Sequence, residues 1–348
     1  RTVDPEITKT NWEIGGIERD IPIIASAMDG VVDVNMAVAL SKLGALGVLN
    51  LEGVQTRYED PEEVLKKIQS IGKEEFVPLM QEIYKQPIKE ELILKRILEI
   101  KDRGGIAAVS GTPLAAIRYK DLIKESQADL FFLQATVVST EHLNKEGKQN
   151  LDLYDLCKNI GIPVAVGNCV TYEVALKLMR AGAAAVMVGI GPGAACTSRG
   201  VLGVGIPQAT AISDCAGARD DFQKESGKYV PIIADGGIIT GGDICKCLAC
   251  GADSVMIGSP IARSQEAPGK GFHWGMATPS PVLPRGTRIK VGTTGSLKSI
   301  LCGPAILDDG THNLLGAIKT SMGTLGATDI KEMQKVEVVV APSLLTEG

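Results

Sequence analysis

The fold is decided by the stretch Pro163-Val-Ala-Val-Gly-Asn168 with its continuation Ala181-Gly-Ala-Ala-Ala-Val-Met-Val-Gly189, because the chain uses this pattern twice. The second copy reads Pro231-Ile-Ile-Ala-Asp-Gly236 and then Cys250-Gly-Ala-Asp-Ser-Val-Met-Ile-Gly258. The glycines that bound the apolar runs are equally spaced in both copies. Each copy places a helix-like segment between two short apolar runs, which indicates one strand–helix–strand module used twice.

The same alternation extends over most of the chain. The predicted strands are Ile21–Met28, Leu46–Leu51, Ile106–Gly111, Leu130–Val138, Pro163–Asn168, Ala184–Ile190, Pro231–Gly237 and Ser254–Ser259. The predicted helices between them are Asn35–Ala45, Pro61–Ile71, Pro113–Gln127, Leu151–Ile160, Thr171–Ala181, Pro207–Ser226 and Gly242–Ala249. Continuous apolar strands separated by amphipathic helices indicate a parallel sheet, and about eight such units predict an α/β fold of the (β/α)8 TIM barrel type. A doubly wound open sheet is the structural alternative, since it uses the same alternation.

Three segments depart from the alternation, but none has the composition of a linker, so we expect residues 1–348 to form a single domain. Residues 1–20 form an N-terminal extension that we expect to cover one end of the barrel. Residues 72–104 contain an additional helix pattern, Lys89–Arg103, whose charges suit a solvated face. Residues 262–313 are rich in Gly, Pro and Thr, and an irregular loop of this length after the last strand predicts an active-site cover or flap.

Composition limits the class of protein. The net charge of −5 argues against nucleic acid or an anionic membrane as the main partner, and no unbroken apolar stretch predicts a membrane span. The eight cysteines sit within apolar patterns, which is typical of reduced thiols and a cytoplasmic location. The run Cys245-Lys-Cys-Leu-Ala-Cys250 lies on a predicted helix without a second ligand pair, so we interpret it as packing and not as a metal site.

The unusual residues gather where barrel strands end, which is where such barrels bind ligands. They are Ser26, Met28, Asn168, Asp235, Gly236, Gly237, Gly258 and Ser259. Glycines after the seventh and eighth strands commonly bind phosphate through backbone amides, and Asp235 is placed to accept from ribose hydroxyls. The alternative for Asp235 is a helix N-cap. The pattern predicts a nucleoside monophosphate as ligand.

The loop from Gly189 to Arg199 follows the sixth strand and reads Gly-Ile-Gly-Pro-Gly-Ala-Ala-Cys-Thr-Ser-Arg. Its glycines expose the backbone to a ligand, and Cys196 lies among exposed amides near Arg199, an environment that favours a thiolate nucleophile. The alternative is a glycine-rich turn with an incidental cysteine.

These motifs resemble the IMP dehydrogenase/GMP reductase family. The residues that carry the resemblance run in order along nearly the whole chain: Ala25-Ser-Ala-Met-Asp29, the Cys196 loop with Gly203-Val-Gly-Ile-Pro-Gln208, Ile233-Ala-Asp-Gly-Gly237, Met256-Ile-Gly-Ser259, Glu266-Ala-Pro-Gly269 and Gly275-Met276. The pair of CBS domains that most IMP dehydrogenases insert after the second helix is absent here, so the chain is similar to the branch of IMP dehydrogenase relatives without CBS domains.

The resemblance implies an oxidoreductase of GMP biosynthesis that converts IMP to XMP with NAD. Cys196 would attack C2 of the purine, hydride would pass to nicotinamide, and the thioimidate would be hydrolysed. Gly237, Gly258 and Ser259 would hold phosphate, Asp235 the ribose, and Gly275 and Met276 the base. His273 stands with the substrate-binding residues, where a Tyr–Arg pair is common. The cofactor would lie near Gln134, Thr136, Gly189 and Gly191. Carbonyls of Gly191, Gly193 and Cys196 would bind K+, and the resemblance implies a homotetramer or an octamer.

The sequence departs from the family in the residues that activate water. The Arg–Tyr pair of the family's flap is missing, because the segment after Met276 is short and no tyrosine follows Tyr229. We hypothesise that Arg285 or Arg288, assisted by Ser198, takes over this role; phosphate or carboxylate binding is the alternative for both arginines. The family's acidic residue near the nicotinamide ribose is replaced within Leu133-Gln-Ala-Thr136.

Three other functions remain open. The first alternative is GMP reductase, which converts GMP to IMP with NADPH, but Arg285 and Asn50-Leu-Glu52 stand where its proton-relay residues would be. The second is a nucleotide-binding regulator that has lost turnover, which the missing flap pair favours. The third is a flavin-dependent barrel, since the same glycines would suit the phosphate of FMN.

Overall fold

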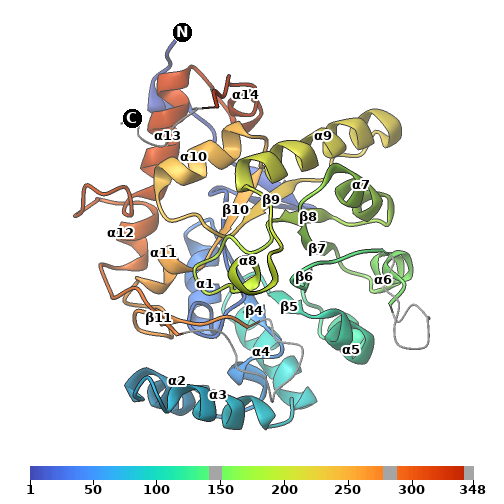
Figure 1. Ribbon diagram of the computed structural model, residues 1–348, viewed down its shortest axis with the longest axis vertical. Coiled ribbons are helices and arrows are strands. Elements are labelled where there is room, and N and C mark those ends of the chain that lie inside the picture. The colour runs from blue at the N-terminus through green and yellow to red at the C-terminus, as the bar shows by residue number, and fades with distance from the viewer. Residues whose placement is uncertain (141–150, 277–287, 341–348) are drawn as a thin grey trace.

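Eight parallel strands close into a barrel in the computed structural model, which describes residues 1–140, 151–276 and 288–340 (Figure 1). Around the barrel the order is β10-β3-β4-β5-β6-β7-β8-β9. The strands are β3 (Ile23–Ala25), β4 (Leu46–Asn50), β5 (Ala108–Gly111), β6 (Leu130–Gln134), β7 (Val164–Cys169), β8 (Ala185–Val188), β9 (Ile232–Asp235) and β10 (Ser254–Ile257). The barrel closes where β10 pairs with β3, with Met256 opposite Ile24. The prediction of a TIM barrel is confirmed, and the open sheet is excluded.

Helices connect successive strands on the outside of the barrel. They are α1 (Val34–Lys42), α2 (Pro61–Ser70), α4 (Glu90–Asp102), α5 (Pro113–Glu125), α6 (Leu153–Asn159), α7 (Tyr172–Arg180), α9 (Gln208–Ser226) and α10 (Gly241–Ala249). Many begin at a side chain that accepts from a free backbone amide of the first turn, for example Asp33, Thr171 and Thr240. These caps explain why helices start close to the predicted positions.

The N-terminal extension covers the end of the barrel at which the strands begin. Its hairpin consists of β1 (Trp12–Ile14) and β2 (Ile17–Arg19), preceded by η1 (Pro5–Ile7). The turn residue Gly15 has a φ of 57°, and a Cβ there would overlap Pro163, which precedes β7. The expected cover is therefore present, and it leaves the opposite end of the barrel to the site residues.

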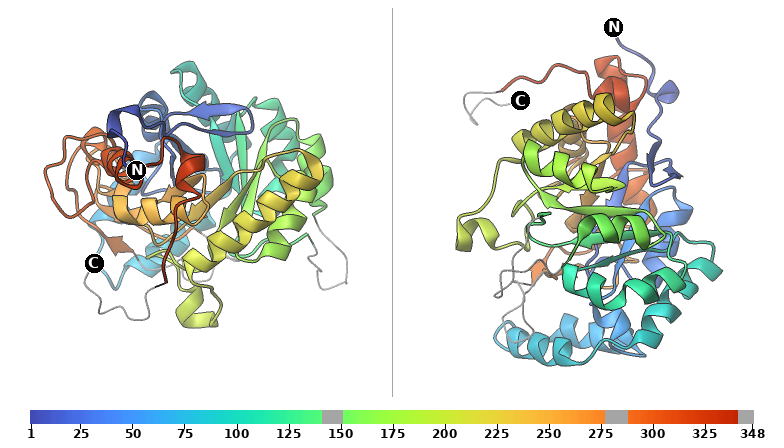
Figure 2. Two further views of the ribbon diagram at one scale, coloured as in Figure 1. Left: turned by 90° about the horizontal axis from the view of Figure 1, so that it is seen from above. Right: turned by 90° about the vertical axis from the view of Figure 1, so that its right-hand side faces the viewer.

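The region between β4 and β5 holds one 3-10 helix and one α-helix that the sequence did not predict. Besides α2 and α4, it contains η2 (Val54–Thr56) and α3 (Phe76–Lys85), whose first turn includes Pro78. Helices α2 and α3 share a small apolar core that includes Phe76, Tyr84 and Trp274, separate from the core of the barrel. In Figure 1 and the right view of Figure 2 they lie at the far end of the long axis from the N-terminus.

The chain after β10 is partly ordered into short elements. These are α11 (Ser259–Ala262), the antiparallel pair β11 (Phe272–His273) and β12 (Ile289–Lys290), α12 (Leu297–Leu301), α13 (Leu314–Leu325) and α14 (Ile330–Met333). Helix α13 packs beside α10 (Figure 1). Since α11 begins at Ser259, the last barrel strand is two residues shorter than predicted. No described helix combines the length and apolarity that crossing a bilayer would require.

Candidate functional site

The ends of the first and last barrel strands bring Ser26, Met28 and Gly258 together. A Cβ built on Gly258 would lie 3.1 Å from the sulfur of Met28 and 3.7 Å from Oγ of Ser26. These residues follow β3 and β10, which are neighbours in the sheet. Gly258 has no side chain, so its backbone is accessible next to Ser26 and Met28, two of the predicted substrate-binding residues. Binding of a phosphate or a base through main-chain groups requires such access.

The glycines after β9 pack directly beneath the cysteine loop, residues 189–197. A Cβ on Gly236 would lie 2.9 Å from Pro192 and 3.1 Å from the amide nitrogen of Gly193, and one on Gly237 would lie 3.0 Å from the Pro192 carbonyl oxygen. Both glycines have positive φ, 94° and 75°. Because Gly236 and Gly237 have no side chains, the backbone after β9 can approach the Cys196 loop closely, and the predicted phosphate site therefore lies next to that loop.

Asp235 and Asn168 form a pair at the carboxyl ends of β9 and β7. Asn168 Nδ2 donates to Asp235 Oδ2 at 2.8 Å and to the Gly189 carbonyl at 2.9 Å. Burial raises the pKa of Asp235 to about 6, although the bond from Asn168 acts in the opposite direction. The N-cap alternative for Asp235 is wrong, because Thr240 caps α10 in a capping box with Asp243.

Cys196 is exposed and lies on a loop that is stabilised by a hydrogen bond between two of its own backbone groups. The Cys196 amide donates to the Gly193 carbonyl at 3.0 Å, and its thiol lies 3.3 Å from Oγ of Ser198. Ser198 is buried and begins α8 (Ser198–Leu202). An exposed thiol with a hydroxyl neighbour can reach a ligand over the barrel, so the geometry is compatible with a nucleophile.

The side chain of Arg199 stabilises the cysteine loop through hydrogen bonds to backbone carbonyls. Its guanidinium donates to the carbonyls of Ile190 at 3.1 Å and Ile206 at 2.6 Å, one on each side of Cys196 in the chain. A Cβ on Gly191 would lie 2.6 Å from Arg199 Cγ, so this glycine leaves room for the arginine. Arg199 therefore stabilises the backbone on both sides of Cys196 through the carbonyls of Ile190 and Ile206.

The oxygens available to a cation in this loop are backbone carbonyls. The described residues contain no group of three or more His, Cys, Asp and Glu side chains suited to a metal. Gly193 has open space on its Cβ side. Neutral carbonyl oxygens on a glycine-rich turn are ligands of the kind that a hard cation such as K+ prefers.

The two side chains predicted near the cofactor lie at the end of β6 in different environments. Gln134 points into the barrel, where its Oε1 accepts from Ser110 Oγ at 3.1 Å and its Nε2 lies 3.5 Å from the sulfur of Met256. Thr136 is exposed beyond the strand. Hydroxyl and amide donors at this edge suit a sugar or an amide group, which nicotinamide nucleotides carry.

His273 contacts Ser259, one of the residues predicted to bind phosphate. Its Nε2 lies 2.8 Å from Oγ of Ser259, and burial lowers the pKa of the imidazole to about 4. Nδ1 has no hydrogen-bond partner among the described residues. The histidine is therefore neutral at physiological pH and orients Ser259 without adding charge.

Of the two base-binding candidates, Gly275 lies against the cysteine loop and Met276 lies against Tyr84. A Cβ on Gly275 would lie 3.2 Å from the carbonyl oxygen of Ala195, the residue before Cys196. The sulfur of Met276 lies 3.5 Å from the hydroxyl of Tyr84, on α3. Tyr84 escaped the sequence analysis because α3 was not predicted, and Asp29, which binds Tyr84, had been assigned no role.

Two arginines were hypothesised to activate water, and the structure describes one of them, Arg288. Arg285 lies outside the described residues. Arg288 is placed differently from the prediction: its guanidinium donates to the carbonyls of Ile68, Gln69 and Ile71, at the end of α2, at 2.5, 3.3 and 2.8 Å. It also faces the Phe272 ring at 4.7 Å. Carbonyls at a helix C-terminus attract cations, so Arg288 acts as a cap of α2.

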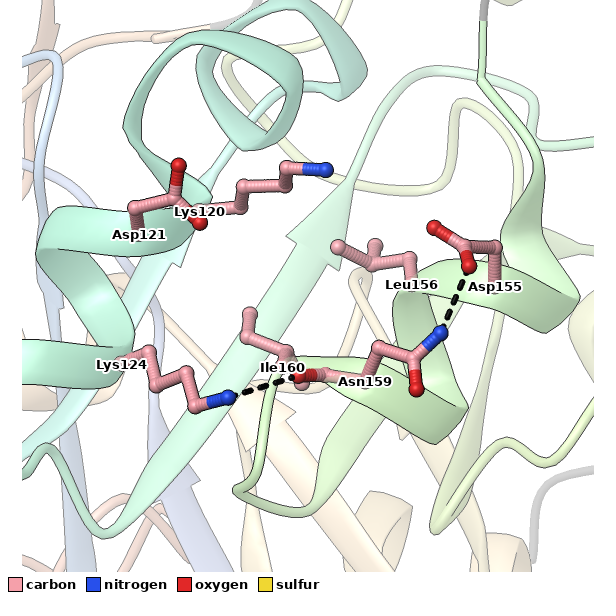
Figure 3. A pocket seen from close by; sticks show the side chains of 7 residues that line it. All are labelled: Lys120, Asp121, Lys124, Asp155, Leu156, Asn159 and Ile160. Carbon is pink, nitrogen blue, oxygen red and sulfur yellow. Dashed lines mark hydrogen bonds between the residues drawn. The ribbon is translucent and has the colours of Figure 1, made fainter.

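Two cavities lie away from these residues. Figure 3 shows one of about 220 Å3 between α5 and α6, crossed by a bond from Lys124 Nζ to the Asn159 carbonyl at 3.5 Å. The other, about 580 Å3, lies beside α1, α2 and α4 and is lined by side chains of both charges, among them Asp33, Lys66 and Arg103. Neither contains a residue predicted to bind substrate or cofactor.

The chain matches the family model of the IMP dehydrogenase / GMP reductase domain over residues 2–278. It is 36% identical to an uncharacterized oxidoreductase of Mycolicibacterium smegmatis, covering 98% of this chain and 93% of that protein. It is 30% identical to the inosine-5'-monophosphate dehydrogenase of Cryptosporidium parvum, over 90% and 82% of the two chains. The crystal structure of an IMP dehydrogenase/GMP reductase-like protein from Corynebacterium glutamicum superposes with a TM-score of 0.91 at 35% identity, covering 98% of this chain and 91% of that one.

Proposed function

Because the chain belongs to the IMP dehydrogenase/GMP reductase family, a family of oxidoreductases, we propose that it oxidises IMP to XMP with NAD through a covalent bond to Cys196. The observation that carries the proposal is the exposed thiol of Cys196 on a loop packed over Gly236 and Gly237. A purine whose phosphate is held by backbone amides at those glycines would present its ring to the loop above.

In this proposal binding precedes chemistry. Gly237, Gly258 and Ser259 hold the phosphate, with Ser259 oriented by neutral His273. Asp235 accepts from the ribose hydroxyls while Asn168 fixes its carboxylate. Gly275 and Met276 bind the base, and Ser26 and Met28 line the same end of the barrel. The result is a C2 atom held at the Cys196 sulfur.

Covalent attachment then divides one difficult oxidation into two easier steps. The Cys196 thiolate adds to C2, and C2 loses its hydrogen with two electrons, which leaves a thioimidate. Gln134, Thr136, Gly189 and Gly191 would hold NAD, which would supply the acceptor for that hydride. Water then adds to C2, and the C–S bond breaks to release XMP and the thiolate. Arg285, assisted by Ser198, whose hydroxyl lies beside the sulfur, is proposed to activate this water, and the proton of the water passes to the solvent.

K+ fits the carbonyls of Gly191, Gly193 and Cys196, where it would hold the loop in shape. A homotetramer or an octamer is part of the same proposal. GMP reductase is disfavoured by the contacts of Glu52, whose carboxylate accepts from the backbone amide and the hydroxyl of Thr112 at 2.7 and 3.1 Å. That carboxylate is committed to capping the start of α5.

A spectrophotometric assay tests the proposal. With IMP, NAD and K+, absorbance of reduced nicotinamide should rise, and Cys196→Ala should abolish the rise, since the thiol is the nucleophile. Cys302→Ala, at a half-buried thiol outside the site, serves as control and should retain activity. Loss of signal with GMP and NADPH would identify a reductase instead. No signal with either pair would leave a nucleotide-binding regulator, and yellow purified protein would indicate flavin.

A further inference from the structure

Three side chains from distant parts of the sequence form one hydrogen-bonded chain beside the candidate site. Trp274 Nε1 donates to the Tyr84 hydroxyl at 2.9 Å, and that hydroxyl donates to Asp29 Oδ2 at 2.5 Å. All three side chains are almost fully buried, with 2% exposure or less. Hydrogen bonds in series polarise one another and are strong where water is excluded, so this chain holds its members in one arrangement.

The carboxylate end of this chain is anchored to the barrel. Asp29 follows β3, and its Oδ2 also accepts from the backbone amide of Val54 at 2.9 Å. A Cβ on Gly53 would overlap the Asp29 carboxylate, so the backbone approaches it as closely as a glycine allows. The guanidinium of Arg57 lies over the Tyr84 ring, 5.7 Å from its centroid, and adds a positive charge on this side.

The other end of the chain reaches the residues proposed to bind the base. Trp274 directly precedes Gly275, which packs against the Ala195 carbonyl beside Cys196. The sulfur of Met276 lies 3.5 Å from the same Tyr84 hydroxyl. One hydroxyl group therefore contacts residues on both sides of Gly275, and it joins the 274–276 segment to Asp29 at the end of β3.

We propose that Tyr84 is a positioning residue that sets residues 274–276 against the cysteine loop and thereby tunes nucleotide binding at Cys196. In this proposal helix α3 contributes to the active site, although it lies outside the barrel. The identity of the nucleotide rests on the proposed function, whereas the link between Tyr84 and the Cys196 loop does not.

The test is Tyr84→Phe, which keeps the ring in its apolar core and removes only the hydroxyl. Tyr58→Phe is the matched control, because the Tyr58 hydroxyl donates to the Ile83 carbonyl in the same helical region at 3.0 Å and does not bond to residues 274–276. Tyr84→Phe should raise the KM for the nucleotide about tenfold with a smaller change in kcat, as expected for one lost buried hydrogen bond at a binding segment. Tyr58→Phe should leave both constants near wild type.

A second measurement needs no turnover. The rate at which iodoacetamide alkylates Cys196 in the free protein, followed by mass spectrometry of the Cys196 peptide, should rise several-fold in Tyr84→Phe and in Asp29→Asn, because the segment beside Ala195 is less firmly held. The rate in Tyr58→Phe should match wild type.

The outcomes separate the two proposals. Wild-type protein inactive on both nucleotides overturns the proposed function, while the alkylation rates still test the role of Tyr84. Equal effects of Tyr84→Phe and Tyr58→Phe on KM and on alkylation would show a merely structural hydroxyl and overturn the inference. If Tyr84→Phe fails to fold, as judged by circular dichroism, Asp29→Asn takes its place in both measurements.

Discussion

At Asp235 and His273, burial shifts two pKa values in opposite directions within one site. The pKa of Asp235 is raised to about 6 and that of His273 is lowered to about 4, both because burial disfavours the charged form. Asp235 therefore binds its proton more tightly in the folded protein, whereas His273 loses its proton more easily. Near neutral pH, the carboxyl is largely ionised for ribose binding and the imidazole is neutral.

Asp235→Asn tests the carboxyl. Because the folded-state pKa is raised, the contribution of Asp235 to stability is fully present below about pH 4 and is lost as the pH rises through about 6. Relative to Asp235→Asn, the wild-type free energy of unfolding should fall by at most about 3 kcal/mol between pH 4 and pH 7. Urea unfolding of both proteins at several pH values measures this difference. A difference that is constant with pH would contradict the shifted pKa.

At the scale of elements, the segment after β10 fastens the helices inserted between β4 and β5 to the barrel. Gln69, on α2, donates to the Pro268 carbonyl at 2.8 Å, and Arg288 caps the end of the same helix. Trp274 belongs to the small core that α2 and α3 share. The predicted active-site cover thus includes a structural support for α2 and α3.

Arg288→Ala should therefore act on stability more than on chemistry. Loss of its bonds to the carbonyls at the end of α2 should cost about 2 kcal/mol of unfolding free energy, since charge-assisted bonds of a half-buried group are lost. Hydrolysis of the covalent intermediate, measured in single-turnover experiments, should stay near the wild-type rate. Lys290→Ala, at an exposed position two residues further along the chain, is the control. Slow hydrolysis at unchanged stability would restore the water-activating role of Arg288.

At the scale of the whole molecule, the two ends of the barrel have separate roles. Residues proposed to bind ligands lie where strands end, while the opposite end carries a buried ionic network around Asp253, which precedes β10. Its carboxylate accepts from Arg219, Lys331 and Tyr229 at 3.2, 2.5 and 2.6 Å. This division is general in TIM barrels, where one face serves stability and the other serves catalysis.

Asp253→Ala should destabilise the protein without changing its chemistry. Removing this carboxylate leaves Arg219 with a buried charge and costs about 3–5 kcal/mol. The activity per folded molecule, measured well below the melting temperature, should remain at the wild-type level. Asp220→Ala removes the exposed partner of the same arginine and should cost less than about 1 kcal/mol. A large loss of activity in folded Asp253→Ala would show that the two ends are coupled.

The sequence by itself determined the barrel and most of the proposed ligand site. Buried parallel strands are continuous apolar runs with glycine at their ends, and this local pattern located all eight strands to within a few residues. The residues that follow such strands must meet at one edge, so Asn168 and Asp235 could be placed together from the sequence, and the bond between them confirms it.

Only the tertiary structure decided the surroundings of the base-binding segment and the role of Arg288. Tyr84 meets Asp29 across 55 residues and Trp274 across 190, and no local periodicity records such contacts. Helix α3, which carries Tyr84, was not among the predicted helices. The sequence alone does not show whether an arginine contacts a carboxylate, a phosphate or helix carbonyls, and only the tertiary structure placed Arg288, which precedes β12, at the end of α2.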